Sequence, residues 1–358
     1  MAEIRKNNPR ANIIYVNTEL AEFRSIKTDR DLYDLVKSKL KKKYNYLFVD
    51  EIQEIEQFEN ALKSLFAEKR CDIYCTGSNA HLLSGELATH LAGRYIQIQV
   101  HPLSYAEFLL FHKLKNTAEA LRKYLHIGGL PYLAEISHQG AAGTGEYLRN
   151  IYESILLRDV VARENIRNIS FLESLVAYLA DNTGNLFSAN NISKYLKSQR
   201  INMPVQTVLN YLAVLEKAFL IHKARRSGIG GLKIFEIGEK YYFEDLGLRN
   251  VLTKEKDLAR IMENAVYLFL LQRGFRVSVG KLRDLEIDFV GEKPGKKIYV
   301  QVAYRIDSKI TERREFGNLE KITDQFPKYV VTLDEDAVRV NSKGVRCVLL
   351  QNFLLLNL

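Results

Sequence analysis

The sequence predicts an α/β protein that opens with a parallel β-sheet and continues into a helical, winged-helix segment and a second α/β domain. Short apolar runs alternate with amphipathic stretches through the first third of the chain, a rhythm typical of a parallel sheet with helices on both faces. A helix-turn-helix pattern with a following strand pair comes next, and a new series of strands ends the chain. A length of 358 residues is enough for two or three domains.

The first third supplies four strands and three helices in alternation. The predicted strands cover residues 12–16, 46–50, 72–76 and 95–100, and the predicted helices cover 29–43, 56–69 and about 80–91. Ligands of parallel sheets bind beyond the carboxyl ends of the strands. We therefore expect the functional side chains of this region to follow the second and third strands.

Composition narrows the class of protein. Hydrophobic residues make up 47% and charged residues 27% of the chain, as in a soluble globular protein. The sequence contains no apolar run of the roughly 18 residues that span a bilayer and no signal peptide, so we expect no membrane association. Three cysteines, Cys71, Cys75 and Cys347, fit a reducing compartment and hence a cytoplasmic location. The net charge of +9 favours an acidic partner such as nucleic acid.

The most informative motif is the run YLFVDEIQ, residues 46–53. Four apolar residues precede Asp50 and Glu51, which indicates a buried strand with two carboxylates at its carboxyl end. In P-loop ATPases the corresponding Asp holds Mg²⁺ and the Glu polarises the attacking water. An Asp-Glu pair in this position also occurs as a simple helix N-cap with a first-turn acid, and that alternative stays open.

Four blocks of the first third, FVDEIQ, CTGSNAHLLSGE, LAGRY and HPLSYAEF, resemble prokaryotic AAA-type ATPases that carry a C-terminal domain of uncharacterised function. The resemblance continues through YFEDLGLRN, MENAVYLFL, LEIDFV and YVQVAY, so it covers nearly the whole chain.

The resemblance implies ATP and Mg²⁺ as cofactors. It makes Asp50 the Mg²⁺-side carboxylate of a Walker B motif and Glu51 the catalytic base. Ser78 and Asn79 would be the polar sensor of the γ-phosphate, and Arg94 an arginine finger. A finger acts on the site of a neighbouring subunit, so the resemblance also implies a homo-oligomer. Ser78 as a helix N-cap and Arg94 as a surface arginine remain alternatives.

One element of the family is missing from the sequence. It contains no G-x-x-x-x-G-K-[ST] phosphate-binding loop, and only residues 1–11 precede the first predicted strand. In the family's sheet the strand before that loop is central, between the strands that here end at Thr76 and Val100. We expect two unpaired strand edges, impaired ATP affinity, and a chain truncated relative to its relatives, whether by a misplaced gene start or by a real loss.

The middle of the chain has the pattern of a winged helix. Helices are predicted at 188–199 and 205–218, the second opened by Pro204. Residues 219–222, 228–231 and 232–243 are predicted to form a two-stranded wing with Lys223, Arg225 and Arg226 at its tip. A winged helix can place its second helix in a DNA major groove and its wing cations on phosphates. The expected DNA-contacting residues are Gln206, Thr207, Asn210, Lys223, Arg225 and Arg226. The partner is either double-stranded DNA or, if the module serves as a lid or an interaction domain, a protein.

The last third resembles the restriction-endonuclease-like core. Glu263 lies on a predicted helix, which is followed by predicted strands at 275–279, 285–290 and 297–303. The second of these strands contains Asp288 and the third contains Gln301. An active core pairs a carboxylate with a lysine two residues later, and here Gln301 and Ala303 replace both. We expect a degenerate core that does not cleave, with Glu263, Asp288 and Gln301 as a weak second metal site.

The expected domains are a partial AAA-type domain at 1–115, a helical lid at 116–180, a winged helix at 181–250 and a restriction-endonuclease-like domain at 251–358. The helical pattern is broken at 128–131 and by the small-residue stretch 140–145, and these two breaks are the best candidate boundaries. The predicted function is that of an AAA-type ATP-binding protein or ATPase with C-terminal modules that bind nucleic acid or protein. The alternative is a non-catalytic DNA-binding protein with a degenerate nuclease-like core, and Ala303 disfavours an active nuclease.

Overall fold

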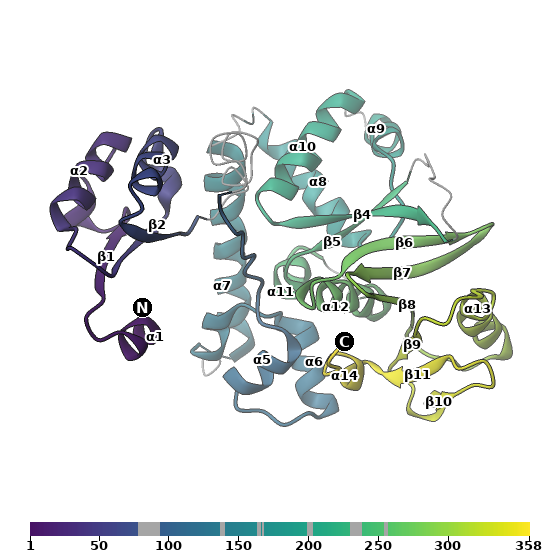
Figure 1. The fold of residues 1–358 in the computed structure, drawn as a ribbon. Helices are drawn as coiled ribbons and strands as arrows, with labels where there is room; N and C mark the ends of the chain where they lie inside the picture. Colours follow the sequence, from purple (N-terminus) through teal and green to yellow (C-terminus); the bar gives the residue numbers. More distant parts are fainter. Residues whose placement is uncertain are drawn as a thin grey trace. The chain divides into compact units, whose positions relative to one another are not determined.

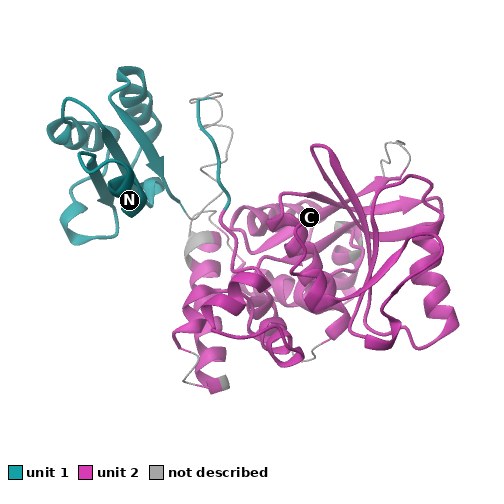
Figure 2. Cartoon of the chain, turned by 60° about the horizontal axis from the view of Figure 1, so that its bottom comes forward, with its two compact units in different colours: residues 1–99 teal, residues 100–358 magenta. Residues whose placement is uncertain are grey.

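The computed structural model describes residues 1–77, 94–136, 140–162, 166, 168–198, 203–229, 238–253 and 257–358. The chain divides into two compact units, Met1–Gln99 and Val100–Leu358 (Figure 2). Each unit has its own hydrophobic core and is described separately below. The finer domain boundaries after residues 115, 180 and 250 stay predictions.

Unit 1 contains a three-stranded parallel sheet in the order β1-β2-β3 (Figure 1). The strands are β1 (Asn12–Asn17), β2 (Asn45–Asp50) and β3 (Cys71–Cys75), and the helices are α1 (Ala2–Asn7), α2 (Asp29–Lys39) and α3 (Phe58–Glu68). A capping box between Thr28 and Asp31 begins α2. The predicted order of strands and helices up to residue 75 is confirmed, apart from shifts of a few residues at the element ends.

The strand predicted at residues 95–100 is wrong, because the structure assigns no strand there. Ile96, Ile98 and Val100 are 91%, 82% and 88% exposed. A strand needs a neighbour that accepts and donates its backbone hydrogen bonds, and within the described residues β3 pairs only with β2. The alternating apolar pattern is therefore present in the sequence without a described partner strand. The predicted helix at 80–91 lies outside the described residues.

Unit 2 is built on an eight-stranded mixed sheet in the order β10-β11-β9-β8-β7-β6-β4-β5 (Figure 1). The strands are β4 (Ile221–Gly228), β5 (Glu239–Phe243), β6 (Arg276–Leu282), β7 (Leu285–Lys293), β8 (Lys296–Ala303), β9 (Lys328–Thr332), β10 (Arg339–Val340) and β11 (Arg346–Leu349). The strands predicted in the last third are confirmed as β6, β7 and β8, each longer than expected. β6, β7 and β8 are antiparallel neighbours, whereas β8 and β9 are parallel.

Helices supply the rest of the core of unit 2. They are α5 (Tyr105–Phe111), α6 (Ala118–Ile127), α7 (Gly140–Ser154), α8 (Ile169–Asp181), α9 (Ala189–Ser198), α10 (Val205–Lys217), α11 (Leu246–Asn250), α12 (Leu258–Gln272), α13 (Lys309–Glu320) and α14 (Leu350–Phe353), with a π-helical stretch at Ile155–Ala162. Helix α12 is buried along most of its length. No helix in the described part of the chain is both long and apolar enough to cross a membrane.

Two details of the helical part differ from the prediction. The small-residue stretch 140–145 is not a break, because it forms the first turns of α7. Gly140 has a φ of +73° at the start of that helix, and the Thr144 hydroxyl donates to the Gly140 carbonyl. The spacing of Val208, Leu209, Leu212 and Leu215 predicts one apolar face on α10, but Leu209 is 42% exposed whereas Val208 is buried. Tyr211 is buried instead.

Two antiparallel strands form in the region predicted as a wing, but with other bounds, because β4 runs through Lys223, Arg225 and Arg226, and the pair is not a free-standing hairpin. β4 and β5 are antiparallel, with Ile221 opposite Phe243. The end of β4 also pairs in parallel with β6, from Arg226 opposite Val279 to Gly228 opposite Lys281. The pair is therefore part of the eight-stranded sheet, with β5 as its edge. Residues 230–237, which include part of the predicted wing, lie outside the described residues.

Candidate functional site

The carboxylate of Asp50 lies at the carboxyl end of the unit 1 sheet, as the motif predicted. Asp50 Oδ2 accepts hydrogen bonds from Tyr15 Oη at 3.2 Å and from Asn17 Nδ2 at 3.3 Å, and Thr76 Oγ1 donates to Asp50 Oδ1. Two of these partners follow from the register, because Asn17 stands opposite Asp50 and Thr76 directly follows β3. Tyr15 precedes Asn17 by two residues on β1, so their side chains point to the same face of the sheet. The sheet thus gathers three polar side chains around one carboxylate.

The neighbouring Glu51 turns the chain sharply away from β2. Its backbone has a φ of +54°, a left-handed conformation that is costly for a residue with a side chain. The turn is tied to the end of β3, because the Glu51 amide donates to Thr76 Oγ1 at 3.4 Å and the Ile52 amide donates to the Thr76 carbonyl at 3.1 Å.

The helix-cap interpretation of the Asp-Glu pair is wrong in this structure. The short 3₁₀ helix Ile52–Glu54 has Glu51 at its N-cap, and no side chain caps it. The Asp50 carboxylate is directed to Tyr15, Asn17 and Thr76 instead. The Glu51 carboxylate accepts a hydrogen bond from Gln53 Nε2 within the same turn, so neither acid caps a helix with its side chain.

The remaining ATPase residues are only partly described. Arg94 is exposed, and its guanidinium lies 5.8 Å from the centre of the Phe66 ring on α3. Ser78 and Asn79 lie outside the described residues. The sensor and finger roles stay predictions.

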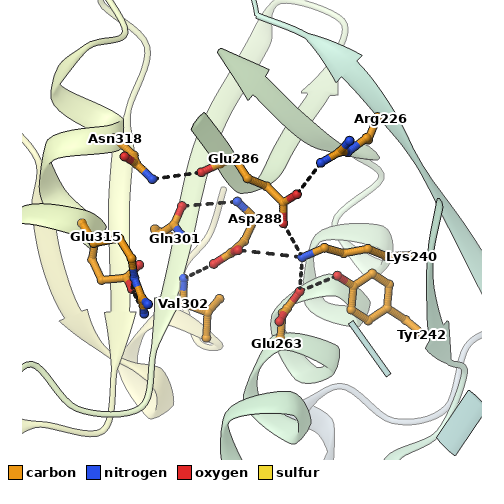
Figure 3. Close-up of polar contacts among 11 residues, drawn as sticks. Arg226, Lys240, Tyr242, Glu263, Glu286, Asp288, Gln301, Val302, Glu315 and Asn318 are labelled. Carbon is orange, nitrogen blue, oxygen red and sulfur yellow. Dashed lines mark hydrogen bonds and ion pairs between the residues drawn. The ribbon is translucent and has the colours of Figure 1, made fainter. Parts of the chain in front are cut away.

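In unit 2 three acidic side chains converge on the ammonium group of Lys240 (Figure 3). Lys240 Nζ lies 3.0 Å from Glu263 Oε1, 3.0 Å from Glu286 Oε1 and 4.0 Å from Asp288 Oδ1. The Tyr242 hydroxyl donates to Glu263 Oε1 at 2.6 Å. We call Lys240, Glu263, Glu286 and Asp288 the Lys240 cluster.

The charges of the Lys240 cluster are partly withdrawn from water. Burial by itself lowers the pKa of Lys240, but the carboxylates of Glu263, Asp288 and Glu286 outweigh it and raise that pKa above its ordinary value. Burial raises the pKa of Asp288, and the negative charge of Glu263 raises it further. The cluster therefore keeps its lysine charged, and the Asp288 carboxyl protonates more readily than that of an ordinary aspartate.

The Gln301 side chain forms a hydrogen bond with the backbone next to this cluster. Its Oε1 accepts from the Asp288 amide at 3.3 Å, and Asp288 Oδ2 accepts from the Val302 amide at 2.8 Å (Figure 3). The structure thus brings the predicted trio of Glu263, Asp288 and Gln301 into one region. What sequence reasoning missed is Lys240, which lies among the carboxylates. Its signal was a lysine directly before the buried aromatic run Tyr241–Phe243.

Most of the expected DNA-contacting cations are paired with acids. Lys223 Nζ lies 3.2 Å from Glu216 Oε2 and 3.8 Å from Glu239 Oε1, and Arg226 Nη2 lies 2.9 Å from Glu286 Oε2. Arg225 is exposed. Pairing of Lys223 and Arg226 with acids reduces the positive charge that these residues can offer to phosphates.

The predicted recognition helix keeps its polar surface. Gln206 and Asn210 are exposed on α10, and Gln206 Nε2 donates to Asn210 Oδ1 at 2.9 Å. Thr207 is half-buried beside them. Both amides are the kind of group that reads base edges or a polar protein surface.

Comparisons with known proteins place these features in a family context. Residues 1–109 match the model of an AAA domain, and residues 118–259 match that of a domain of unknown function. An uncharacterised protein of Haemophilus influenzae is 36% identical over 90% of this chain and 81% of its own length. An uncharacterised protein of Methanocaldococcus jannaschii is 30% identical over 84% of this chain and 70% of its own length.

Among solved structures, a Walker-type ATPase of Pyrococcus abyssi is similar with a TM-score of 0.44 and 17% identity, over 69% of this chain and 85% of that one.

Proposed function

Because this chain belongs to a family of proteins with an AAA domain, which includes these proteins of Haemophilus influenzae and Methanocaldococcus jannaschii, we propose that unit 1 provides the Mg²⁺-side half of an ATP site. The observation that carries the proposal is the position of Asp50 at the carboxyl end of a parallel sheet, with Asn17 and Thr76 beside it. Ligands of such sheets bind at that edge.

The donor set fits Mg²⁺. Asp50 offers a carboxylate and Thr76 a hydroxyl, and Mg²⁺ prefers oxygen ligands of this kind together with water and phosphate oxygens. Mg²⁺ would neutralise charge on the phosphates of ATP. In this arrangement Asp50 holds the metal, and Glu51, the next residue, accepts a proton from the attacking water.

The site in unit 1 lacks the groups that usually contact the phosphates of ATP. Loop amides and a lysine supply most of the phosphate affinity in P-loop proteins, and this sequence has no such motif. We therefore propose that the chain by itself turns over ATP poorly, and that hydrolysis requires a strand and a phosphate-binding loop placed beside β3. Oligomerisation through Arg94 is part of the same proposal.

The test supplies the missing contacts. A strand, phosphate-binding loop and helix are fused ahead of Met1, and phosphate release from Mg²⁺-ATP is measured. Turnover by the fusion that is lost in its Asp50→Ala variant supports the proposal. An equally rapid turnover by the unfused chain would contradict it.

For unit 2 we propose a non-cleaving, restriction-endonuclease-like and winged-helix module that binds duplex DNA or a protein. Lys240 carries this proposal, because its ammonium group already balances the carboxylates that would otherwise hold a metal ion. At the predicted weak second site of Glu263, Asp288 and Gln301, Mg²⁺ would then compete with the ammonium group of Lys240. Cleavage of duplex DNA with Mg²⁺ would contradict this part of the proposal.

A further inference from the structure

Three potential metal ligands meet in unit 2 away from the Lys240 cluster. His101 Nδ1 lies 2.7 Å from Glu244 Oε1, and His222 Nε2 contacts Glu244 Oε2. One ligand atom from each of the three side chains lies within 4.8 Å of the other two. The three residues stand far apart in the sequence, so only the tertiary structure brings them together.

The backbone on each side of this group is fixed. The carbonyl of Pro102, next to His101, accepts from Gln272 Nε2 of α12 at 3.0 Å. His222 is part of β4, and its ring centre lies 6.0 Å from that of Tyr267. The Glu244 amide donates to the Leu220 carbonyl at 3.1 Å. Ligands held in this way lose little freedom when an ion binds.

The three side chains are also largely withdrawn from solvent, with 14%, 16% and 10% of the surfaces of His101, His222 and Glu244 exposed. Burial alone would raise the pKa of Glu244, but the hydrogen bonds to the two imidazoles outweigh it and lower that pKa. The carboxylate is thus kept ionised, which is the form that binds a metal.

We propose that His101, His222 and Glu244 bind one divalent transition-metal ion, for which Zn²⁺ is the suitable probe. Two imidazole nitrogens and one carboxylate oxygen are a ligand set that suits Zn²⁺ and not Mg²⁺ or Ca²⁺, which favour all-oxygen sites. Zn²⁺ bonds of about 2.0–2.1 Å place tetrahedral ligand atoms roughly 3.4 Å apart, so side-chain shifts of about an ångström admit the ion. Water completes the coordination.

The bound ion ties three segments together. It links the first residues of unit 2, at His101, to β4 and to the end of β5. The competing arrangement is a metal-free triad in which both imidazoles donate to the Glu244 carboxylate. Metal binding would replace these hydrogen bonds with bonds from the two imidazoles and the carboxylate to the ion.

The test uses the full chain without an affinity tag, stripped with a chelator and dialysed. Zn²⁺ binding is measured by calorimetry and by metal analysis after gel filtration, together with the melting temperature with and without Zn²⁺. We expect one equivalent of Zn²⁺ and a rise in melting temperature for the wild type. Both are lost in His222→Ala and in Glu244→Gln, and both are retained in His126→Ala, which removes an exposed histidine outside the group.

X-ray absorption of the zinc-loaded wild type needs no variant and guards against a failure of the variants to fold. Scattering from two imidazoles and no sulfur supports the assignment. A sulfur shell would show that Cys71, Cys75 or Cys347 holds the ion, and it would overturn the proposal. Absence of stoichiometric Zn²⁺ in the wild type, or its persistence in the double variant His222→Ala, Glu244→Gln, would overturn it as well.

Discussion

Lys240 Nζ lies 3.0 Å from Glu263 Oε1, at the place where a nuclease-like core would be expected to hold a metal ion. Glu263 and Asp288 were expected to share Mg²⁺, and they share an ammonium group instead. The ammonium group of a lysine carries one positive charge and is covalently attached to the chain. It therefore neutralises the carboxylates without providing the Lewis acid that phosphodiester cleavage needs.

Replacement of Lys240 should therefore lower the free energy of unfolding of unit 2. Lys240→Met leaves the carboxyl groups of Glu263, Glu286 and Asp288 around an uncharged side chain, and removal of one partner from a buried charge group costs about 3–5 kcal/mol. The side chain of Lys240 is only 5% exposed. We expect the free energy of unfolding of unit 2, from urea titration at pH 7, to fall by about that amount. In the matched control Lys297→Met, which breaks the more exposed pair with Glu292, the fall should stay below about 1 kcal/mol. Equal losses in both variants would argue against a special role for Lys240.

The same core should not cut DNA. With Mg²⁺ and supercoiled plasmid, the wild type is expected to give no nicking above that of the Asp288→Ala variant, because Lys240 occupies the carboxylates and Ala303 supplies no lysine charge. Nicking by the wild type that disappears in Asp288→Ala would show an active nuclease, contrary to our proposal.

The role of Glu51 can be separated from that of Asp50 in the fusion that carries a phosphate-binding loop. Glu51→Gln should abolish ATP turnover and keep ATP binding, because an amide cannot accept the proton of water while Asp50 still holds Mg²⁺. Phosphate release and binding of a fluorescent ATP analogue measure the two effects. An unchanged kcat in Glu51→Gln would remove this residue from the mechanism.

DNA binding by unit 2 should be weak and dependent on salt. Each phosphate that a cation contacts contributes a slope of about −0.9 to log K against log salt. Arg225 is exposed whereas Arg226 is paired with Glu286, so Arg225→Ala should flatten the slope by roughly one unit and Arg226→Ala by much less. Fluorescence anisotropy of a labelled duplex at several salt concentrations gives the slopes. If no binding is detected at low salt, the protein-partner alternative is favoured.

Stability should depend on pH through Asp245. Burial raises the pKa of this carboxyl to about 6, and the nearby Glu244 adds to the rise. The carboxyl accepts from the Gly129 amide at 2.6 Å and from the Leu248 amide at 3.0 Å. In the unfolded chain it ionises near its ordinary pKa of about 3.9. The folded state therefore loses stability as the pH rises from about 4 to about 6, by about 3 kcal/mol at most.

The control for this effect is Asp245→Asn, which cannot ionise. Its altered hydrogen bonds shift its stability by a constant amount, so the informative quantity is the difference between wild type and variant as a function of pH. We expect the wild type to lose stability relative to Asp245→Asn between pH 4 and pH 6 in urea titrations. A flat difference across that range would mean that Asp245 keeps an ordinary pKa in the folded protein.

The sequence predicted the elements of this protein well where the signal is local. The strands β1, β2 and β3 and the helices between them follow from runs of apolar residues and from helix caps, which depend on neighbours a few positions away. The position of Asp50 and Glu51 follows in the same way, because the carboxyl end of a strand is visible in the sequence. The strand expected at 95–100 failed, since a strand also needs a partner that its own residues do not specify.

Contacts between distant segments were decided only by the tertiary structure. Lys240 meets Glu263 and Asp288, Arg226 is neutralised by Glu286, and His101 meets His222 and Glu244, although nothing in the spacing of these residues joins them. The sequence by itself determined the α/β class and the carboxylates at the sheet edge. The eight-stranded sheet decided which charges are paired, because pairing depends on strand order and burial, and neither is encoded in local periodicity.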